Sequence, residues 1–238
     1  MDILIPLGRG SRWSDNELRY CLRSVEKHLI GYSHIFLVGE CPLWIDRDTV
    51  IHIPAEDIEG FGFRDYNIYQ KIMAGCEHSL ITDNFLFMND DHFLLQNFTV
   101  QDFPYYHQGP LIDAIDSIGD VPYRKVLWNT YAHLKKEIED PLNFDVHCPI
   151  RYNRNLLKLC FDMEWPNYGF AIKSIYCNKI GITGERVTDL KFRTSQSRSE
   201  IMRELEGKPF FSIGDKCLKG DMKQVLQEFY PSKSKFEI

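Results

Sequence analysis

A short apolar segment that runs directly into two carboxylates is the feature that most constrains the fold. Residues 85–88, FLFM, are apolar, aromatic-rich and too few for a helix, so they predict a buried strand. Asp90, Asp91 and His92 follow within four positions. Adjacent carboxylates at the end of a buried strand repel each other and are costly to desolvate, and a divalent cation would remove both penalties. The segment therefore indicates a central strand whose carboxyl end binds a ligand, as in open α/β sheets; a plain solvated turn is the alternative.

The residues before this segment alternate between strand and helix patterns. Residues 3–7, 34–38 and 50–53 have the composition of buried strands. After the first of these, Ser14 and Glu17 fit a capping box that would start a helix. That helix presents one apolar face at helical spacing, made of Leu18, Cys21, Leu22, Val25 and Leu29. A second helix is expected to start at residue 64 and to end before the strand that carries Asp90 and Asp91. This order predicts an α/β fold with a largely parallel sheet and right-handed crossovers.

The second half of the chain is less regular. Its patterns predict helices at 131–139, 153–161 and 168–180, an extended segment at 144–150, a strand at 210–215 and a last helix that ends before Pro231. Residues 191–199 are polar and cationic, which favours a mobile loop. No repeat or linker divides the sequence, so we expect one domain, 1–238.

Composition excludes several classes of protein. The 238 residues are 44% hydrophobic and 26% charged, as in ordinary globular proteins. A net charge of -6 weighs against a nucleic-acid-binding protein, which usually carries a basic face. The seven cysteines include no CxxC pair, which favours reduced thiols over zinc or disulfides. The sequence opens in a strand, and no apolar run approaches the length of a membrane span, so we expect a cytoplasmic protein.

Three arginines and one histidine complete the candidate site. Arg9 and Arg12 follow the first strand and Arg64 starts the second helix, so all three are candidates to hold a diphosphate at one sheet edge; solvated surface arginines are the alternative. His147 lies in an extended segment between Asp145 and Pro149 and is a candidate metal ligand, or else a core or surface histidine. Carboxylate, imidazole and phosphate oxygen together suit manganese or magnesium. GxGxxG, P-loop and GxSxG motifs are missing from the sequence.

Three segments resemble a known family. Residues 2–7 (DILIPL), 16–27 (NELRYCLRSVEK) and 85–91 (FLFMNDD) are similar to GT-A-fold glycosyltransferases, and most of all to Stealth-type capsular polysaccharide phosphotransferases. The similarity covers roughly the first hundred residues, with a loose match beyond it at His147 and Pro149. In GT-A enzymes a DxD motif binds the metal that holds the diphosphate of the donor. Asn89 stands in the place of its first aspartate, so the resemblance implies Asp91 as a metal ligand and Asp90 as a second ligand or a sugar contact.

The resemblance implies a GT-A-like fold, with residues 1–100 binding a nucleotide sugar and 101–238 an acceptor. The expected donor, a UDP-sugar, would contact Pro6, Leu7, Gly8, Arg9, Arg12, Arg64, Asn67, Asn89 and Asp90. The expected metal, Mn²⁺ or Mg²⁺, would be held by Asp91, Asp90 and His147. Asp91 and Arg64 would act in catalysis, and Asp145 would be the general base of an inverting reaction, with Asp162 and Glu164 as other candidates.

The expected reaction moves a sugar to a hydroxyl of a polysaccharide, a glycolipid or another acceptor, with a modified DNA base still among the candidates. Two alternatives stay open. One is a Stealth-like transfer of sugar 1-phosphate. The other is a non-catalytic module that binds nucleotide or carbohydrate.

Overall fold

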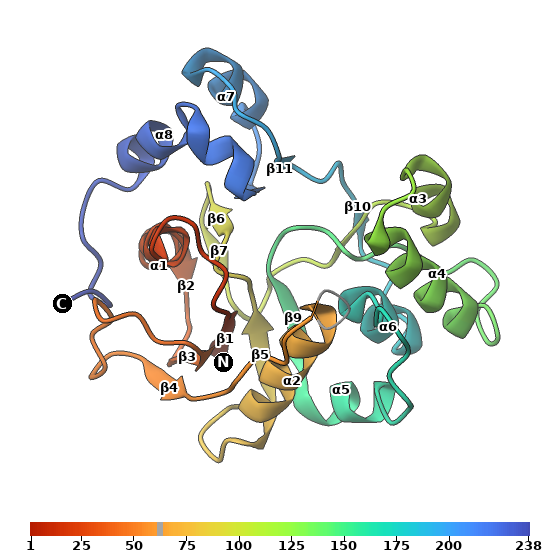
Figure 1. Cartoon of the computed structure of the whole chain (residues 1–238). Helices are drawn as coiled ribbons and strands as arrows, with labels where there is room; N and C mark the ends of the chain where they lie inside the picture. Colours follow the sequence, from red (N-terminus) through yellow and green to blue (C-terminus); the bar gives the residue numbers. More distant parts are fainter. Residues whose placement is uncertain (61–63) are drawn as a thin grey trace.

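Five strands form the main sheet in the computed structural model, which describes residues 1–60 and 64–238. They are β1 (Asp2–Leu7), β3 (Ile35–Gly39), β4 (Ile51–Ile53), β5 (Asn84–Phe87) and β9 (Ile150–Asn153). Their order is β4-β3-β1-β5-β9, with the first four parallel and β9 antiparallel to β5. Helices flank this sheet (Figure 1). The predicted α/β fold with a mostly parallel, Rossmann-like sheet is therefore confirmed.

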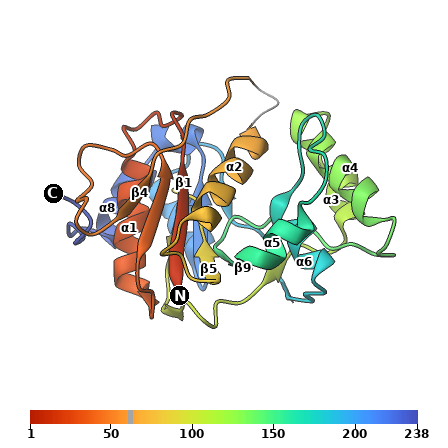
Figure 2. The same ribbon diagram turned by 90° about the horizontal axis from the view of Figure 1, so that it is seen from below.

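The central strand β1 is buried on both faces because helices cover both. Ile3 and Ile5 belong to the core under α1 (Asn16–His28), whereas Leu4 packs in the core of α2 (Arg64–Glu77). Side chains alternate along a strand, so a continuous apolar run matches a strand with two covered faces. Figure 2 shows the two helices on either side of β1. The glycines at positions 60 and 62 indicate a loop before α2, and residues 61–63 of it lie outside the described residues.

The start of α1 differs from the expected capping box. Ser14 and Asp15 adopt positive φ angles of 53° and 56°, and no side chain caps the helix at Asp15. Instead the Ser11 hydroxyl accepts the amides of Trp13 and Asp15 and donates to Glu17 at 2.8 Å. The capping box at Ser14 and Glu17 is therefore wrong, because the left-handed backbone replaces the extended conformation that a capping residue needs.

The second half adds four helices on the side of the sheet away from α1 (Figure 1). They are α3 (Leu111–Ser117), α4 (Pro122–Leu134), α5 (Arg154–Cys160) and α6 (Ile172–Lys179). The helix expected at 131–139 is α4, which starts nine residues earlier at Pro122 and ends at Leu134. Proline suits the first turn because its missing amide would be unpaired there. Within 144–150 only Ile150 belongs to a strand, the first residue of β9.

A smaller sheet joins the acidic segment to the end of the chain. β12 (Phe210–Ile213) lies between β11 (Lys191–Phe192) and β6 (His92–Leu94), parallel to the first and antiparallel to the second. Residues 191–199 thus form β11 and the start of α7 (Arg198–Leu205), not a loop alone. A 3₁₀ helix, η2 (Asp215–Lys219), and α8 (Met222–Phe229) follow.

Two short strand pairs complete the structure. They are β2 (Leu29–Ile30) with β7 (Phe98–Thr99), and β8 (Tyr106–His107) with β10 (Glu185–Arg186). No helix within the described residues is long and apolar enough to cross a membrane.

Candidate functional site

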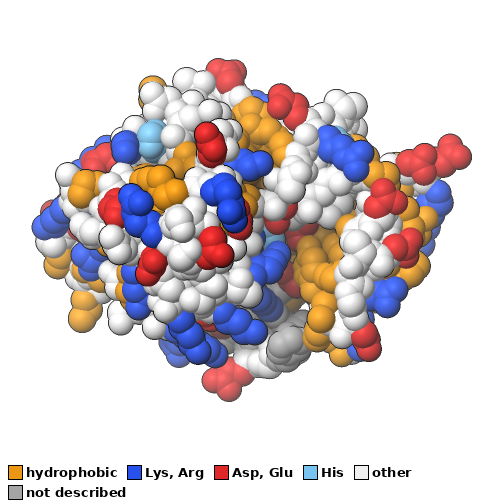
Figure 3. Space-filling view, turned by 90° about the horizontal axis from the view of Figure 1, so that it is seen from above, with side chains coloured by type: hydrophobic (Ala, Val, Ile, Leu, Met, Phe, Trp, Pro, Cys, Tyr) orange, Lys and Arg blue, Asp and Glu red, His pale blue; other side chains and the backbone are white. Residues whose placement is uncertain are grey.

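The acidic turn lies at the carboxyl end of the central strands. Met88, just after β5, donates its amide to the carbonyl of Leu4 in β1, and β6 begins at His92. The amide of Asn89 donates to His92 Nδ1 at 3.2 Å and closes the turn that holds Asp90 and Asp91. In the space-filling view the molecule is hollowed between a larger and a smaller part, and acidic and histidine side chains lie in the hollow (Figure 3).

Asp91 is held by two groups from the smaller sheet. Its Oδ2 accepts from Lys191 Nζ at 2.8 Å and from the Ser212 hydroxyl at 3.0 Å. Burial would raise the pKa of Asp91, but the charge and the hydrogen bond of the Lys191 ammonium oppose it, and that pKa lies below its usual range. The other oxygen, Oδ1, is buried and has no hydrogen-bond partner in the described part of the chain. Asp91 therefore stays ionised with one oxygen free for a ligand.

The pKa of Asp90 is shifted in the opposite direction from that of Asp91. Burial, and then the negative charges of Asp91 and Glu17, raise the pKa of Asp90 to about 8. At neutral pH the turn thus keeps a proton on one of its two carboxyl groups. A bound cation would stabilise the second negative charge that this environment disfavours.

His147 is oriented by a carboxylate 42 positions further along the chain. Asp189 accepts the His147 backbone amide at 2.8 Å and contacts its Nδ1 at 2.6 Å. Because Nδ1–H donates to the carboxylate, the neutral ring carries its lone pair on Nε2. A carboxylate behind a histidine is the arrangement that orients histidine ligands of metals, and it also suits proton transfer.

Lys173 of α6 fixes the segment that carries His147. Its buried ammonium donates to the carbonyls of Val146 at 2.6 Å and Cys148 at 2.7 Å, the residues on either side of the histidine. A lysine that satisfies two buried carbonyls restrains the backbone between them. Lys173 is therefore a positioning residue for His147.

His92 is not available as a ligand in this arrangement. Its Nδ1 accepts from the Asn89 amide, so the proton of the neutral ring lies on Nε2, which is 3.9 Å from Asp91 Oδ1. Burial, and then the charge of Lys173, lower the pKa of His92 well below its usual value, so the ring stays neutral. Its role is to shape the turn.

The two arginines after β1 diverge. Arg9 pairs with Glu40 at 2.5 Å, next to the end of β3, and Arg12 reaches Asp215 at 3.6 Å, after β12. Both side chains are largely exposed. Pro6 and Leu7 are buried within β1. The structure thus does not bring Arg9 and Arg12 together on one ligand.

A buried ion pair lies at this edge instead. Lys71 of α2 is 5% exposed and pairs with Asp57. A Cβ atom on Gly8 would lie 2.9 Å from Asp57 Oδ2, and one on Gly39 would lie 2.7 Å from Lys71 Cε. Glycines at the ends of β1 and β3 thus make room for this ion pair, in which Asp57 balances the charge of Lys71.

The start of α2 gives Arg64 and Asn67 different surroundings. Arg64 is exposed at the first residue of the helix. Asn67 binds the backbone of Ile58 through both ends of its amide, at 3.0 and 2.9 Å, so it anchors the preceding loop. Asp57 pairs with Lys71 and leaves Arg64 to face solvent or a ligand.

Asp145 lies in a second carboxyl cluster. Its Oδ2 accepts from the hydroxyl of Tyr123, whose pKa burial and the Asp145 charge raise well above the usual value. Asp65, in the first turn of α2, has a pKa raised to about 7 by burial and then by the charge of Asp145. Asp145 is therefore a hydrogen-bonded carboxylate with a second acid nearby.

The donor chemistry of the turn fits a divalent cation, although the ligand set is incomplete. Among the described residues, Asp91 Oδ1 is a buried oxygen without a hydrogen-bond partner, and the neutral His147 ring has an oriented lone pair on Nε2. The same ring, when protonated, lies near enough to lower the pKa of Asp91. Within the described ranges, no three His, Cys, Asp or Glu side chains are grouped closely enough to hold a metal ion. Phosphate oxygens and water commonly complete a magnesium or manganese sphere.

Most of this network joins residues far apart in sequence, so local patterns could not reveal it. Lys191 and Ser212 lie 100 and 121 positions from Asp91. Lys173 and Asp189 belong to none of the motifs found in the sequence. A comparison of the sequence with models of known protein families finds no match.

Proposed function

We propose that this protein is a metal-dependent glycosyltransferase that moves a sugar from a nucleotide-sugar donor to an acceptor hydroxyl. The observation that carries the proposal is the free, buried Oδ1 of Asp91 at the carboxyl end of β5, with His147 held nearby by Asp189. Ligands of open α/β sheets bind at this edge. The similarity of residues 2–7, 16–27 and 85–91 to GT-A enzymes supports the same assignment.

The donor diphosphate is assigned to the edge formed by β1, β3 and β5. Asp91 and His147, with Asp90, are the residues that would hold Mn²⁺ or Mg²⁺, which supplies positive charge for the leaving diphosphate. Arg64 adds an exposed cation at this edge that can approach a phosphate as a fork, whereas the buried ammonium of Lys71 is already paired with Asp57. These groups favour the charge that develops when the bond to the sugar breaks.

Proton removal from the acceptor is assigned to Asp145 if the reaction inverts configuration. Tyr123 donates to Oδ2 and thereby orients the carboxylate, so Oδ1 is the atom that takes the proton of the hydroxyl. A UDP-sugar remains the preferred donor, and the acceptor class extends from polysaccharide and glycolipid to a modified DNA base. All seven cysteines are free, which accords with the reducing cytoplasm.

The test is to incubate the purified protein with a panel of UDP-sugars and other nucleotide sugars, with Mn²⁺ or Mg²⁺, and to identify the released nucleotide. Glycosyl transfer, including slow transfer to water, releases the nucleoside diphosphate. Transfer of sugar 1-phosphate breaks the bond between the phosphates and releases the monophosphate. Metal-dependent binding without either product would identify the non-catalytic module.

The matched variants are Asp91→Asn and, as a control, Asp116→Asn, an exposed aspartate on α3. We expect Asp91→Asn to abolish the metal-dependent rise in melting temperature caused by UDP, and Asp116→Asn to preserve it. Equal metal-dependent stabilisation of both variants by UDP would contradict the site.

A further inference from the structure

A cavity of about 500 Å³ lies at the segments that follow β11 and β12, and four of its eight lining residues are cationic. Its charged residues are Arg12, Lys216, Lys219, Lys223 and one carboxylate, Asp215. Four positive charges against one negative leave the lining at +3, in a chain whose net charge is -6. Such a concentration of one sign raises the local concentration of anions.

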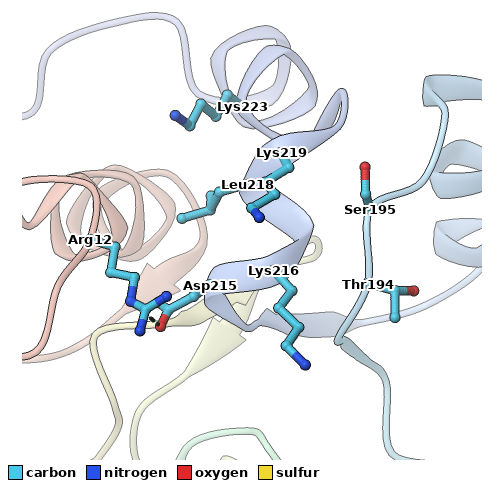
Figure 4. A pocket seen from close by; sticks show the side chains of 8 residues that line it. All are labelled: Arg12, Thr194, Ser195, Asp215, Lys216, Leu218, Lys219 and Lys223. Atoms are coloured by element: carbon cyan, nitrogen blue, oxygen red, sulfur yellow. Dashed lines mark ion pairs between the residues drawn. The ribbon is translucent and has the colours of Figure 1, made fainter.

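The lysines of this cavity are not consumed by internal ion pairs. Within residues 1–60 and 64–238, Arg12 forms an ion pair with Asp215. In the same ranges, Lys216, Lys219 and Lys223 form no ion pair with a carboxylate. Lys223 lies over the ring of Trp13 at 5.2 Å. Lys216 and Lys219 are exposed on the 3₁₀ helix. In Figure 4 these two lie between Arg12 and the segment that carries Thr194 and Ser195.

The two strands that hold Asp91 lead directly into this cavity. Lys191 on β11 precedes Thr194 by three residues, and Ser212 on β12 precedes Asp215 by three. Three extended residues span at most about 10 Å. A ligand bound in the cavity is therefore within reach of the acidic turn if it is the size of a sugar phosphate. A volume of 500 Å³ is also in the range of small-molecule sites.

We propose that this cavity is a second phosphate subsite, which binds the phosphate group of a phosphorylated acceptor. The acceptor assignment rests on the proposed function. Seven of the eight lining residues come from 194–223, in the half that would bind the acceptor, and Arg12 alone comes from the donor loop. Lysine ammonium and serine or threonine hydroxyl groups are ordinary phosphate ligands, and the fork of Arg12 adds a bidentate one.

The experiment measures pyrophosphate binding by calorimetry in EDTA, so that neither metal nor donor is needed. The test variant is Lys216→Gln/Lys219→Gln, and the matched control is Lys208→Gln/Lys233→Gln, two exposed lysines outside the cavity. We expect the wild type and the control to bind alike and the test variant to bind at least tenfold more weakly. Because all four lysines are exposed, none of these changes should disturb folding, which melting temperatures check.

A second titration separates the two phosphate sources. UDP with Mn²⁺ should bind the test variant and the control equally, and pyrophosphate should bind the wild type with UDP present. Loss of UDP affinity in the test variant would assign the cavity to the donor and overturn the acceptor proposal.

Absence of pyrophosphate binding, or equal pyrophosphate binding by the wild type, the test variant and the control, would overturn the subsite itself. If duplex DNA binds more tightly than pyrophosphate, and its binding depends on Lys216 and Lys219, the proposal of a small-molecule ligand would be overturned. A failure of the proposed function would appear separately, as a wild type that binds pyrophosphate but no nucleotide sugar.

Discussion

Lys191 shows how one side chain sets the state of the acidic turn. Its side chain is 12% exposed, and its ammonium lies 2.8 Å from an oxygen of Asp91, whose side chain is 18% exposed. The pair neutralises one carboxylate of the turn before any ligand arrives. Asp91 is therefore both a candidate ligand and half of a structural ion pair, and a simple substitution would disturb both roles.

The first prediction separates these roles with a double variant. Asp91→Asn should lower the free energy of unfolding by about 2–3 kcal/mol, because it leaves a mostly buried ammonium unpaired. Adding Lys191→Gln should restore most of that loss without restoring metal-dependent UDP binding. Chemical denaturation and calorimetry measure the two quantities. Recovery of UDP binding together with stability would show that Asp91 acts only through Lys191.

The second prediction concerns Asp65, whose pKa is raised to about 7. In the unfolded chain this group titrates near 4, so the folded state favours the protonated form. Its contribution to stability is complete below pH 4 and is lost as the pH rises through 7. Asp65→Asn should therefore raise the melting temperature at pH 8 relative to the wild type. Because the side chain is only half-buried, we expect a gain of roughly 1–2 kcal/mol, below the full value of a three-unit shift.

The check is the difference in melting temperature between Asp65→Asn and the wild type from pH 4 to 8. It should be near zero at the acid end and grow towards pH 8. A constant difference would show that Asp65 does not titrate in this range.

Among the helices, α6 contributes both to the core and to the site. Ile172, Ile175 and Tyr176 pack in the apolar core, while Lys173 turns to the segment of His147. An amphipathic pattern would place a lysine on the solvent side of a helix. Here the irregular segment 144–149 covers that side, and its buried carbonyls need a donor.

The third prediction is that Lys173→Met destabilises the protein and loosens His147. Two buried carbonyls would lose their donor, which should cost about 2–4 kcal/mol of unfolding free energy. Metal affinity should fall about tenfold or more, as when the support of a ligand is lost. Lys179→Met is the control on the same helix, since Lys179 donates at 3.1 Å to the single carbonyl of Cys160 and not to the His147 segment. Equal metal affinity in both variants would remove Lys173 from the site.

At the scale of the whole molecule, the two halves of the chain share one sheet and both cores. β9 pairs with β5, so the second half covers the edge of the main sheet. Phe211 and Leu226 belong to the same core as Ile3, and Tyr152 packs on Phe85 with ring centroids 5.8 Å apart. The half that carries the family resemblance is therefore not a separate folding unit.

The fourth prediction follows from this arrangement. A fragment of residues 1–100 should not fold, because it would expose the apolar edge strand β5 and much of both cores. Its amide NMR spectrum should show the narrow dispersion of an unfolded chain, and the full chain should unfold in one cooperative transition. A well-dispersed spectrum of the fragment would contradict a shared core.

The features of this fold that could be predicted from the sequence alone are local ones. Apolar runs predicted β1, β3, β4 and β5, and helical spacing predicted α1 and α2, because both follow from the repeat of side chains along one segment. Position after a buried strand also placed Asp90 and Asp91 at the carboxyl edge of the sheet. The starts of α1 and α4 were misplaced, since backbone conformation and packing overrode the pattern there.

Only the tertiary structure decided what surrounds the carboxylates. It paired Asp91 with Lys191, which the sequence suggested was in a mobile loop, and His147 with Asp189. It also separated Arg9 from Arg12 and gathered Lys216 and Lys219 beside the second of these. Such contacts depend on how distant segments pack, and the energy of an ion pair depends on the burial that packing creates. Local sequence patterns show neither how distant segments pack nor how deeply an ion pair is buried.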